Sequence, residues 1–190
     1  MRTVFAASGT ALLLAVTLQG CGSDASPSSD PKPSASPTAP PGLVAPEPEK
    51  PKAADTERSA VDYGQYFVKL VEYSLRIRSA RPVQAEAFDL ATCSVCRKLD
   101  TAVQEMKRKG RFQITPDIRL GRFSAVSTSD GYAVTGRFLF PSGRFVKLDG
   151  TRVDSADGGP FRFAADLRWD ATRSRWRMVD YDFLPTGASG

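Results

Sequence analysis

The chain has 190 residues, with 26 Lys and Arg against 21 Asp and Glu, which gives a formal net charge of +5. It contains no histidine, which excludes Ser-His-Asp and Cys-His catalysis and histidine-ligated metal chemistry. Carboxylates and the three cysteines remain as candidates for chemistry. No nucleic-acid-binding motif is present, so no nucleic-acid partner is expected.

Residues 1–20 have the layout of a secretory signal peptide. Arg2 is the only charged residue before Asp24, and residues 4–18 are apolar or small apart from Thr10, Thr17 and Ser8. A stable membrane-spanning helix needs about 20 apolar residues, and this run is shorter. The pattern therefore predicts the apolar region of a signal peptide rather than a mature anchor helix.

The end of this segment resembles the lipobox of bacterial lipoprotein signals. Leu18, Gly20 and Cys21 match the pattern, whereas Gln19 stands where a small residue is commoner. The resemblance implies cleavage after Gly20 and a diacylglycerol group on the Cys21 thiol. Because two acyl chains anchor a protein stably, we expect attachment to the outer face of the cell membrane. The alternative is an ordinary secreted protein with a leftover cysteine.

Residues 21–56 hold nine of the 14 prolines and no aromatic residue. Such a stretch cannot bury enough apolar surface to offset the entropy of ordering it. We therefore predict a disordered Pro/Ser-rich spacer between the membrane and a domain over 57–190. That domain carries 22 basic and 16 acidic residues. Ordinary solubility explains this balance, and attraction to an anionic envelope is the alternative.

The folded part begins with helical patterns. Residues 57–78 show apolar side chains at spacings of three and four, and Asp55 or Thr56 can cap the helix. A short helix is expected to open at Pro82. A second long helix is predicted over 93–109, where the apolar spacing returns.

From residue 118 the apolar period changes to two, which indicates β-strands. Asp130-Gly131 is a strong hairpin signal, and residues 149–160 are expected to form a loop. The predicted strands cover 118–128, 132–140, 145–148, 161–169 and 176–183. Helices followed by a run of antiparallel strands indicate an α+β domain.

This order of elements resembles the nuclear transport factor 2-like and SnoaL-like superfamily. The residues that carry the resemblance are 66–70 in the first helix, the break at 79–82, and the final strand at 176–183. It implies N-terminal helices packed in a curved, cone-shaped antiparallel sheet. With the lipobox, the proline-rich spacer and a Cys-x-x-Cys motif, the whole chain resembles a lipoprotein family of high-GC Gram-positive bacteria, which brings no assigned activity.

If Cys21 is lipidated, Cys93 and Cys96 remain as a pair in an oxidising compartment. A structural disulfide at the start of a helix is the expected outcome. The alternative is a redox-active pair, because a helix N-terminus lowers the pKa of the first thiol. Two cysteines supply only half of a tetrahedral zinc site, so a metal site is not expected.

The last strand carries the candidates for an acid–base site. Asp180 and Asp182 share one face of that strand, and Tyr181 and Phe183 share the other, because side chains two apart point the same way. Two interpretations of these carboxylates are open: they lie on a strand face exposed to solvent, or they line a pocket inside the cone. Asp166 has the same two interpretations.

From these features we expect a membrane-anchored extracytoplasmic domain that binds an envelope protein or wall component without catalysis and without a cofactor. Two alternatives stay open. One is an enzyme that performs acid–base chemistry in the cone pocket. The other is a thiol–disulfide partner that acts through Cys93 and Cys96.

Overall fold

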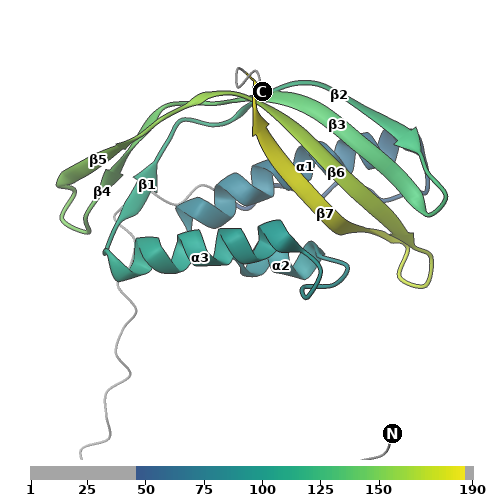
Figure 1. Ribbon diagram of the computed structural model, residues 1–190, viewed down its shortest axis with the longest axis horizontal. Helices are drawn as coiled ribbons and strands as arrows, with labels where there is room; N and C mark the ends of the chain where they lie inside the picture. Colours follow the sequence, from purple (N-terminus) through teal and green to yellow (C-terminus); the bar gives the residue numbers. More distant parts are fainter. Residues whose placement is uncertain (1–45, 187–190) are drawn as a thin grey trace, which may run out of the picture. The chain divides into compact units, whose positions relative to one another are not determined.

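The computed structural model describes residues 46–186. The predicted signal peptide, Cys21 and most of the predicted spacer lie outside the described residues. Within the described part, no helix is long and apolar enough to cross a membrane. Helices come first and antiparallel strands follow, so the α+β class predicted from the sequence is confirmed (Figure 1).

Three helices form the N-terminal half of the described chain: α1 (Glu57–Arg76), α2 (Arg81–Glu86) and α3 (Ser94–Arg108). Thr56 caps α1, since its hydroxyl accepts a hydrogen bond from the Ser59 amide at 3.3 Å. The short helix α2 ends before Ala87, which is extended and forms a bridge with Met178. The loop after α2 therefore lies against the final strand.

The seven strands form two antiparallel sheets. One has the order β2-β3-β6-β7 and the other β1-β4-β5. The strands are β1 (Phe112–Ile114), β2 (Arg119–Ser127), β3 (Gly131–Phe140), β4 (Gly143–Val146), β5 (Arg152–Ala156), β6 (Gly159–Asp170) and β7 (Arg175–Pro185).

Two of the short strands differ from the sequence-based prediction. The prediction of a continuous loop over 149–160 is wrong, because that segment contains β5. Strand β1 has no counterpart among the predicted strands. Both have too few residues for a readable alternation, and their backbone pairing with β4 defines them instead. Because the partner strand is distant in the sequence, this backbone pairing produces no clear pattern in the local sequence.

A sharp bend joins the two sheets. Strands β3 and β4 are separated only by Pro141 and Ser142, and β5 and β6 only by Asp157 and Gly158. A Cβ atom on Gly158 would collide with the Ser142 amide nitrogen and the Phe140 carbonyl oxygen. The absence of a side chain at Gly158 therefore lets the two chain segments cross closely at the bend.

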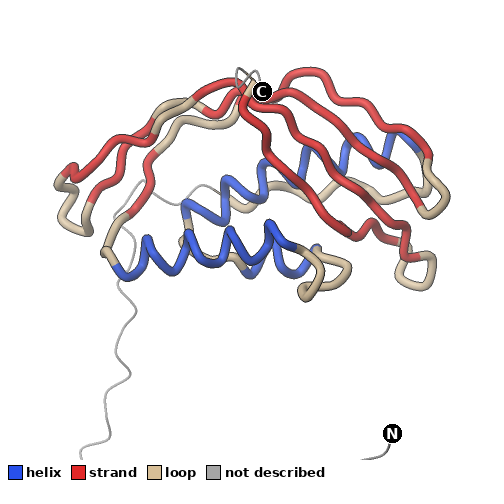
Figure 2. The backbone as a smooth tube through the Cα atoms, viewed as in Figure 1, coloured by secondary structure: helices blue, strands red, loops and turns tan. Residues whose placement is uncertain are grey.

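The main core lies between the helices and the four-stranded sheet. Both sheets lie on the same side of the helices, and the strands arch over them (Figure 2). The largest fully buried side chains include Tyr63 and Phe67 of α1, Phe163 of β6 and Trp176 of β7. Alternation along β6, and along β7 on each side of the β-bulge between Met178 and Asp180, thus places one face of each strand against the helices.

The last part of the predicted spacer is attached to the domain. We call residues 46–54 the strap. Lys50 Nζ lies 2.6 and 2.7 Å from the two carboxylate oxygens of Glu86, and the Tyr63 hydroxyl donates to the same carboxylate at 2.8 Å. Glu86 is only 8% exposed. Lys50 therefore supplies the countercharge of a buried carboxylate, and the structured domain begins before residue 57.

Ser59 holds the other end of the strap. Its hydroxyl oxygen accepts hydrogen bonds from the Ala54 amide and from Trp176 Nε1, both at 3.0 Å. The same hydroxyl lies 3.4 Å from the Lys52 carbonyl, to which it donates. One serine thus joins the strap, the first turn of α1 and the final strand.

Candidate functional site

A pocket of about 240 Å³, which we call the apolar pocket, lies between α1 and the concave side of the strands. Its lining consists of Val68, Val71 and Leu75 of α1, Ile118 in the loop before β2, Phe138 and Phe140 of β3, Phe161 of β6, Phe183 of β7, and Asp157 at the bend between the sheets.

The periodicities of the helix and the strands together produce this lining. The three aliphatic residues of α1 recur at spacings of three and four, which places them on one helix face. On the strands, the Phe138 ring lies 5.6 Å from that of Phe161 and 5.2 Å from that of Phe183. These separations suit stacked and edge-to-face pairs, so the wall is held by ring contacts across three strands.

The lining of the apolar pocket offers few groups for acid–base chemistry. Asp157 is the one ionisable residue in its lining. General acid–base catalysis needs a donor and an acceptor positioned on the reacting atoms, and the lining offers no such pair. An apolar cavity of about 150 Å³ can hold benzene, so this larger pocket has room for a small aromatic or aliphatic group.

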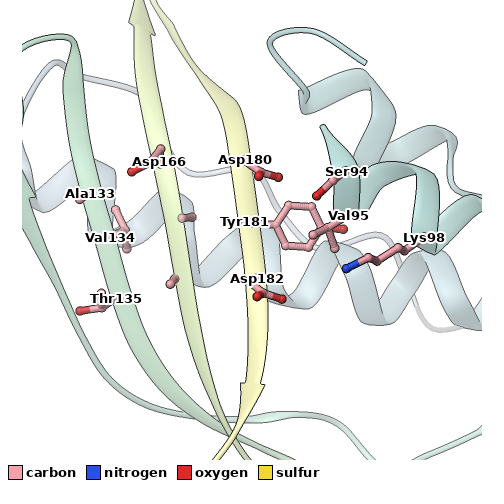
Figure 3. A pocket seen from close by; sticks show the side chains of 12 residues that line it. Ser94, Val95, Lys98, Ala133, Val134, Thr135, Asp166, Asp180, Tyr181 and Asp182 are labelled. Carbon is pink, nitrogen blue, oxygen red and sulfur yellow. The ribbon is translucent and has the colours of Figure 1, made fainter. Parts of the chain in front are cut away.

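A second hollow, of about 280 Å³, contains the candidate residues of the last strand. We call it the acidic hollow (Figure 3). It is lined by Ser94, Val95 and Lys98 of α3, Ala133, Val134 and Thr135 of β3, Ala164, Ala165 and Asp166 of β6, and Asp180, Tyr181 and Asp182 of β7. The structure therefore brings all three predicted candidates and Asp166 to one place.

Over residues 180–183 the last strand alternates as the sequence indicates. Tyr181 is buried, and its ring centroid lies 4.8 Å from that of Phe67 in the core. Asp182 is exposed and Asp180 is partly exposed. The carboxylates thus belong to the less buried face of β7, and the apolar pocket inside the arch does not include them.

The environment of Tyr181 keeps its hydroxyl protonated. Burial raises the pKa of Tyr181 well above its usual value, and the nearby charge of Asp180 raises this pKa further. A phenol that takes part in proton transfer near neutral pH needs a lowered pKa. Tyr181 is therefore suited to hydrogen bonding rather than to acid–base catalysis.

Cys93 and Cys96 form a disulfide at the start of α3, as expected from their spacing. Cys93 is fully buried and Cys96 is 2% exposed. Thiol–disulfide exchange requires a thiolate to reach one sulfur of the bond. Because both residues are shielded, the geometry favours a structural bond.

Two features of the structure have only weak signals in the sequence. The apolar pocket could have been inferred from the phenylalanines that alternate along β3 and β6, but its α1 wall requires the packing of distant segments. The pair formed by Lys50 and Glu86 has no local pattern at all, since 36 positions separate the two residues.

No family model matches the chain, and no curated protein matches it. Solved structures similar to it include the intermembrane space region of the chloroplast protein ARC6, with a TM-score of 0.41 and 13% identity over 69% of this chain and 98% of that chain. A nuclear transport factor 2-like superfamily protein from Salmonella enterica serovar Typhimurium has a TM-score of 0.41 and 10% identity, over 70% of this chain and 92% of that chain. An NTF2-like protein is thus among the structural neighbours of this chain.

Proposed function

We propose that this protein is a membrane-anchored extracytoplasmic lipoprotein whose folded domain binds a small apolar ligand without catalysing a reaction. In this proposal residues 1–20 are a signal peptide, Cys21 carries the lipid, and the following residues are a spacer that ends at the strap. The helices and strands form a cone of the nuclear transport factor 2-like type. The apolar pocket is the interior of that cone.

One observation carries the binding role: the apolar pocket has an aromatic and aliphatic wall with a single carboxylate, Asp157, in its lining. Ligand sites are generally concave and apolar with a few polar groups that orient the ligand. We propose that Asp157 is the orienting group, because it accepts hydrogen bonds and attracts a positive charge.

Binding is tested with the full chain produced without lipid and with indole as an aromatic probe, followed by NMR of the methyl groups that line the pocket. Leu75→Trp should fill the pocket and weaken indole binding by about tenfold or more, which corresponds to a loss of about 1.4 kcal/mol. Leu90→Trp adds the same ring at a residue that is 48% exposed and should leave binding unchanged. Equal weakening by both variants, or no methyl shift with indole, would contradict the proposal.

The anchor is tested separately by fractionation of cells that express the protein. Cys21→Ala removes the thiol that would carry the lipid, so the protein should move from the membrane fraction to the soluble fraction. Retention of this variant on the membrane after a high-salt wash would contradict lipid anchoring. It would leave the interpretation of the apolar pocket untouched.

A further inference from the structure

The acidic hollow contains three carboxylates that the register of the sheet forces together. Asp166 of β6 lies directly opposite Asp180 of β7. Asp182, which is two residues further along β7 and on the same face, lies opposite Ala164. Like charges directly opposite each other on neighbouring strands destabilise a sheet. A positive charge beside this pair would therefore stabilise the sheet.

No ion pair within residues 46–186 supplies that charge. Among residues 46–186, none of the three carboxylates takes part in an ion pair with Lys or Arg, whereas Asp170 and Asp130 of the same sheet region are paired with arginines. Lys98 lines the hollow, but its ammonium group forms no ion pair with these carboxylates either. Within residues 46–186, the only side-chain hydrogen bond of Asp182 is one that it accepts from the amide of its neighbour Phe183, at 2.8 Å.

Buried polar atoms at the hollow also have no partner. Tyr181 is 3% exposed, and its hydroxyl has no hydrogen-bond partner in the described protein. Its ring extends from β7 toward Val95 and Lys98 of α3, on the side where these residues line the hollow (Figure 3). One carboxylate oxygen of Asp180 is likewise buried without a partner. Buried polar groups are nearly always hydrogen-bonded in folded proteins, so both atoms are available for a hydrogen bond to a bound group.

We propose that the acidic hollow is a second binding site and that it takes an organic cation, a guanidinium or a primary ammonium group on a short alkyl chain. Guanidinium and ammonium groups carry several N–H donors and no acceptor, which matches a set of carboxylate oxygens. Charge-assisted hydrogen bonds of this kind are stronger than neutral ones. The cation would also remove the repulsion between Asp166 and Asp180.

The shape of the hollow favours an organic cation over a metal ion. Within the described residues, no group of three or more Asp, Glu or Cys side chains is arranged to hold a metal ion. The side chains of Ala133 and Ala164 in the lining are small, which leaves apolar space for the methylene groups of the ligand. A hollow of about 280 Å³ has room for a chain of a few carbon atoms together with its charged end.

The cation has two sources with the same chemistry: a free small amine, or an Arg or Lys side chain of a partner protein. Agmatine represents the first source, and a short peptide with one central arginine represents the second. Both are titrated into the full chain produced without lipid, and binding is followed by shifts of the backbone amides of β6 and β7. Butylurea, which has a similar length and no charge, serves as the ligand control.

Agmatine, the peptide or both should shift the amides around Asp166 and Asp180 in a saturable manner. Asp180→Asn should weaken this binding by about tenfold or more, because it removes one of the negative charges that the cation neutralises. Asp62→Asn removes an equal charge from the exposed side of α1, where Asp62 pairs with Arg58, and should leave binding unchanged. Tyr181→Phe should weaken binding by about threefold, the loss of one hydrogen bond.

The melting temperature of each variant shows whether it is folded, and Asp182→Asn replaces Asp180→Asn if the latter is not. Tighter binding of the peptide than of agmatine would identify a partner side chain as the source, and the reverse order would identify a small amine. Equal effects of Asp180→Asn and Asp62→Asn, or equal binding of butylurea, would overturn the proposal. Neither result depends on the apolar pocket, since indole binding is measured separately.

Discussion

Tyr63 and Tyr181 show two ways in which this domain buries a phenol. The Tyr63 hydroxyl donates to the buried carboxylate of Glu86, whereas the Tyr181 hydroxyl has no partner among the described residues. Burial is the main cause of a raised pKa in both residues, and the charge of a nearby carboxylate adds to it. At neutral pH the Tyr63 hydroxyl should therefore contribute more to stability than the Tyr181 hydroxyl. At high pH both hydroxyls should make the folded state less stable as the pH rises.

We expect Tyr63→Phe to lower the free energy of unfolding at pH 7 by about 1–3 kcal/mol, because Glu86 loses a hydrogen bond. Tyr181→Phe should change this free energy by no more than about 0.5 kcal/mol, since no protein bond is lost. Urea denaturation of the two variants and the parent measures both values. A larger loss in Tyr181→Phe would show that its hydroxyl has a partner.

The same variants predict the response to alkaline pH. A tyrosine whose pKa is higher in the folded state than in the unfolded state binds more protons when folded at pH values above about 10, the ordinary pKa of tyrosine. Stability therefore falls as the pH rises through this range. Each Tyr→Phe variant should show a shallower fall between pH 9.5 and 11, measured by urea denaturation at each pH. An unchanged slope would contradict the raised pKa.

At the scale of elements, the contact between α1 and the four-stranded sheet depends on Gly64. A Cβ atom at this position would lie 2.8 Å from Val134 Cγ1 and 3.3 Å from Phe163 Cε1. Glycine weakens a helix by about 1 kcal/mol relative to alanine. Its presence in the middle of α1 is therefore explained by close packing against β3 and β6 and not by helix propensity.

Gly64→Ala should accordingly destabilise the domain by about 1–2 kcal/mol, because the cost of overpacking exceeds the gain in helix propensity. Lys69→Ala, on the exposed side of the same helix, should change stability by less than about 0.5 kcal/mol. Thermal and urea unfolding provide the measurement. A more stable Gly64→Ala variant would show that α1 can move away from the sheet at no cost.

At the scale of the whole molecule, the strap connects segments that lie far apart in the sequence. Lys50 reaches Glu86 in α2, and Ser59 connects the strap to Trp176 in the last strand. Lys50 Nζ also lies 5.9 and 6.0 Å from the ring centroids of Tyr63 and Tyr66, within the range of a cation–π contact. The strap is therefore held to the domain by an ion pair, by hydrogen bonds and by a cation–π contact.

Lys50→Ala should release the strap and leave the carboxylate of Glu86 without its cation. Because the Lys50 side chain is 38% exposed, the ion pair is partly screened, and we expect a loss of about 1–2 kcal/mol. Trypsin cleavage after Lys52 should become several times faster, which mass spectrometry of a limited digest can follow. Glu49→Ala is the matched control and should not change the cleavage rate. Unchanged cleavage in Lys50→Ala would show that the ion pair does not hold the strap.

The sequence alone determines the elements of this protein whose signals are local. The spacing of apolar residues marks α1 and α3, and alternation marks β3, β6 and β7, because each pattern repeats within one segment. Cys93 and Cys96 are three positions apart, so their pairing is also a local property. Asp180, Asp182 and Tyr181 could be selected as candidates because a strand places alternate residues on opposite faces.

Only the tertiary structure decided which distant groups meet. Strands β1 and β5 form because β4 provides their backbone partners, and Lys50 belongs to the domain because Glu86 is buried beside it. The register that sets Asp166 opposite Asp180 and the helix that closes the apolar pocket are likewise results of packing. Contacts of this kind join residues far apart in the chain, and their energy comes from burial and charge at the contact itself, which no local pattern encodes.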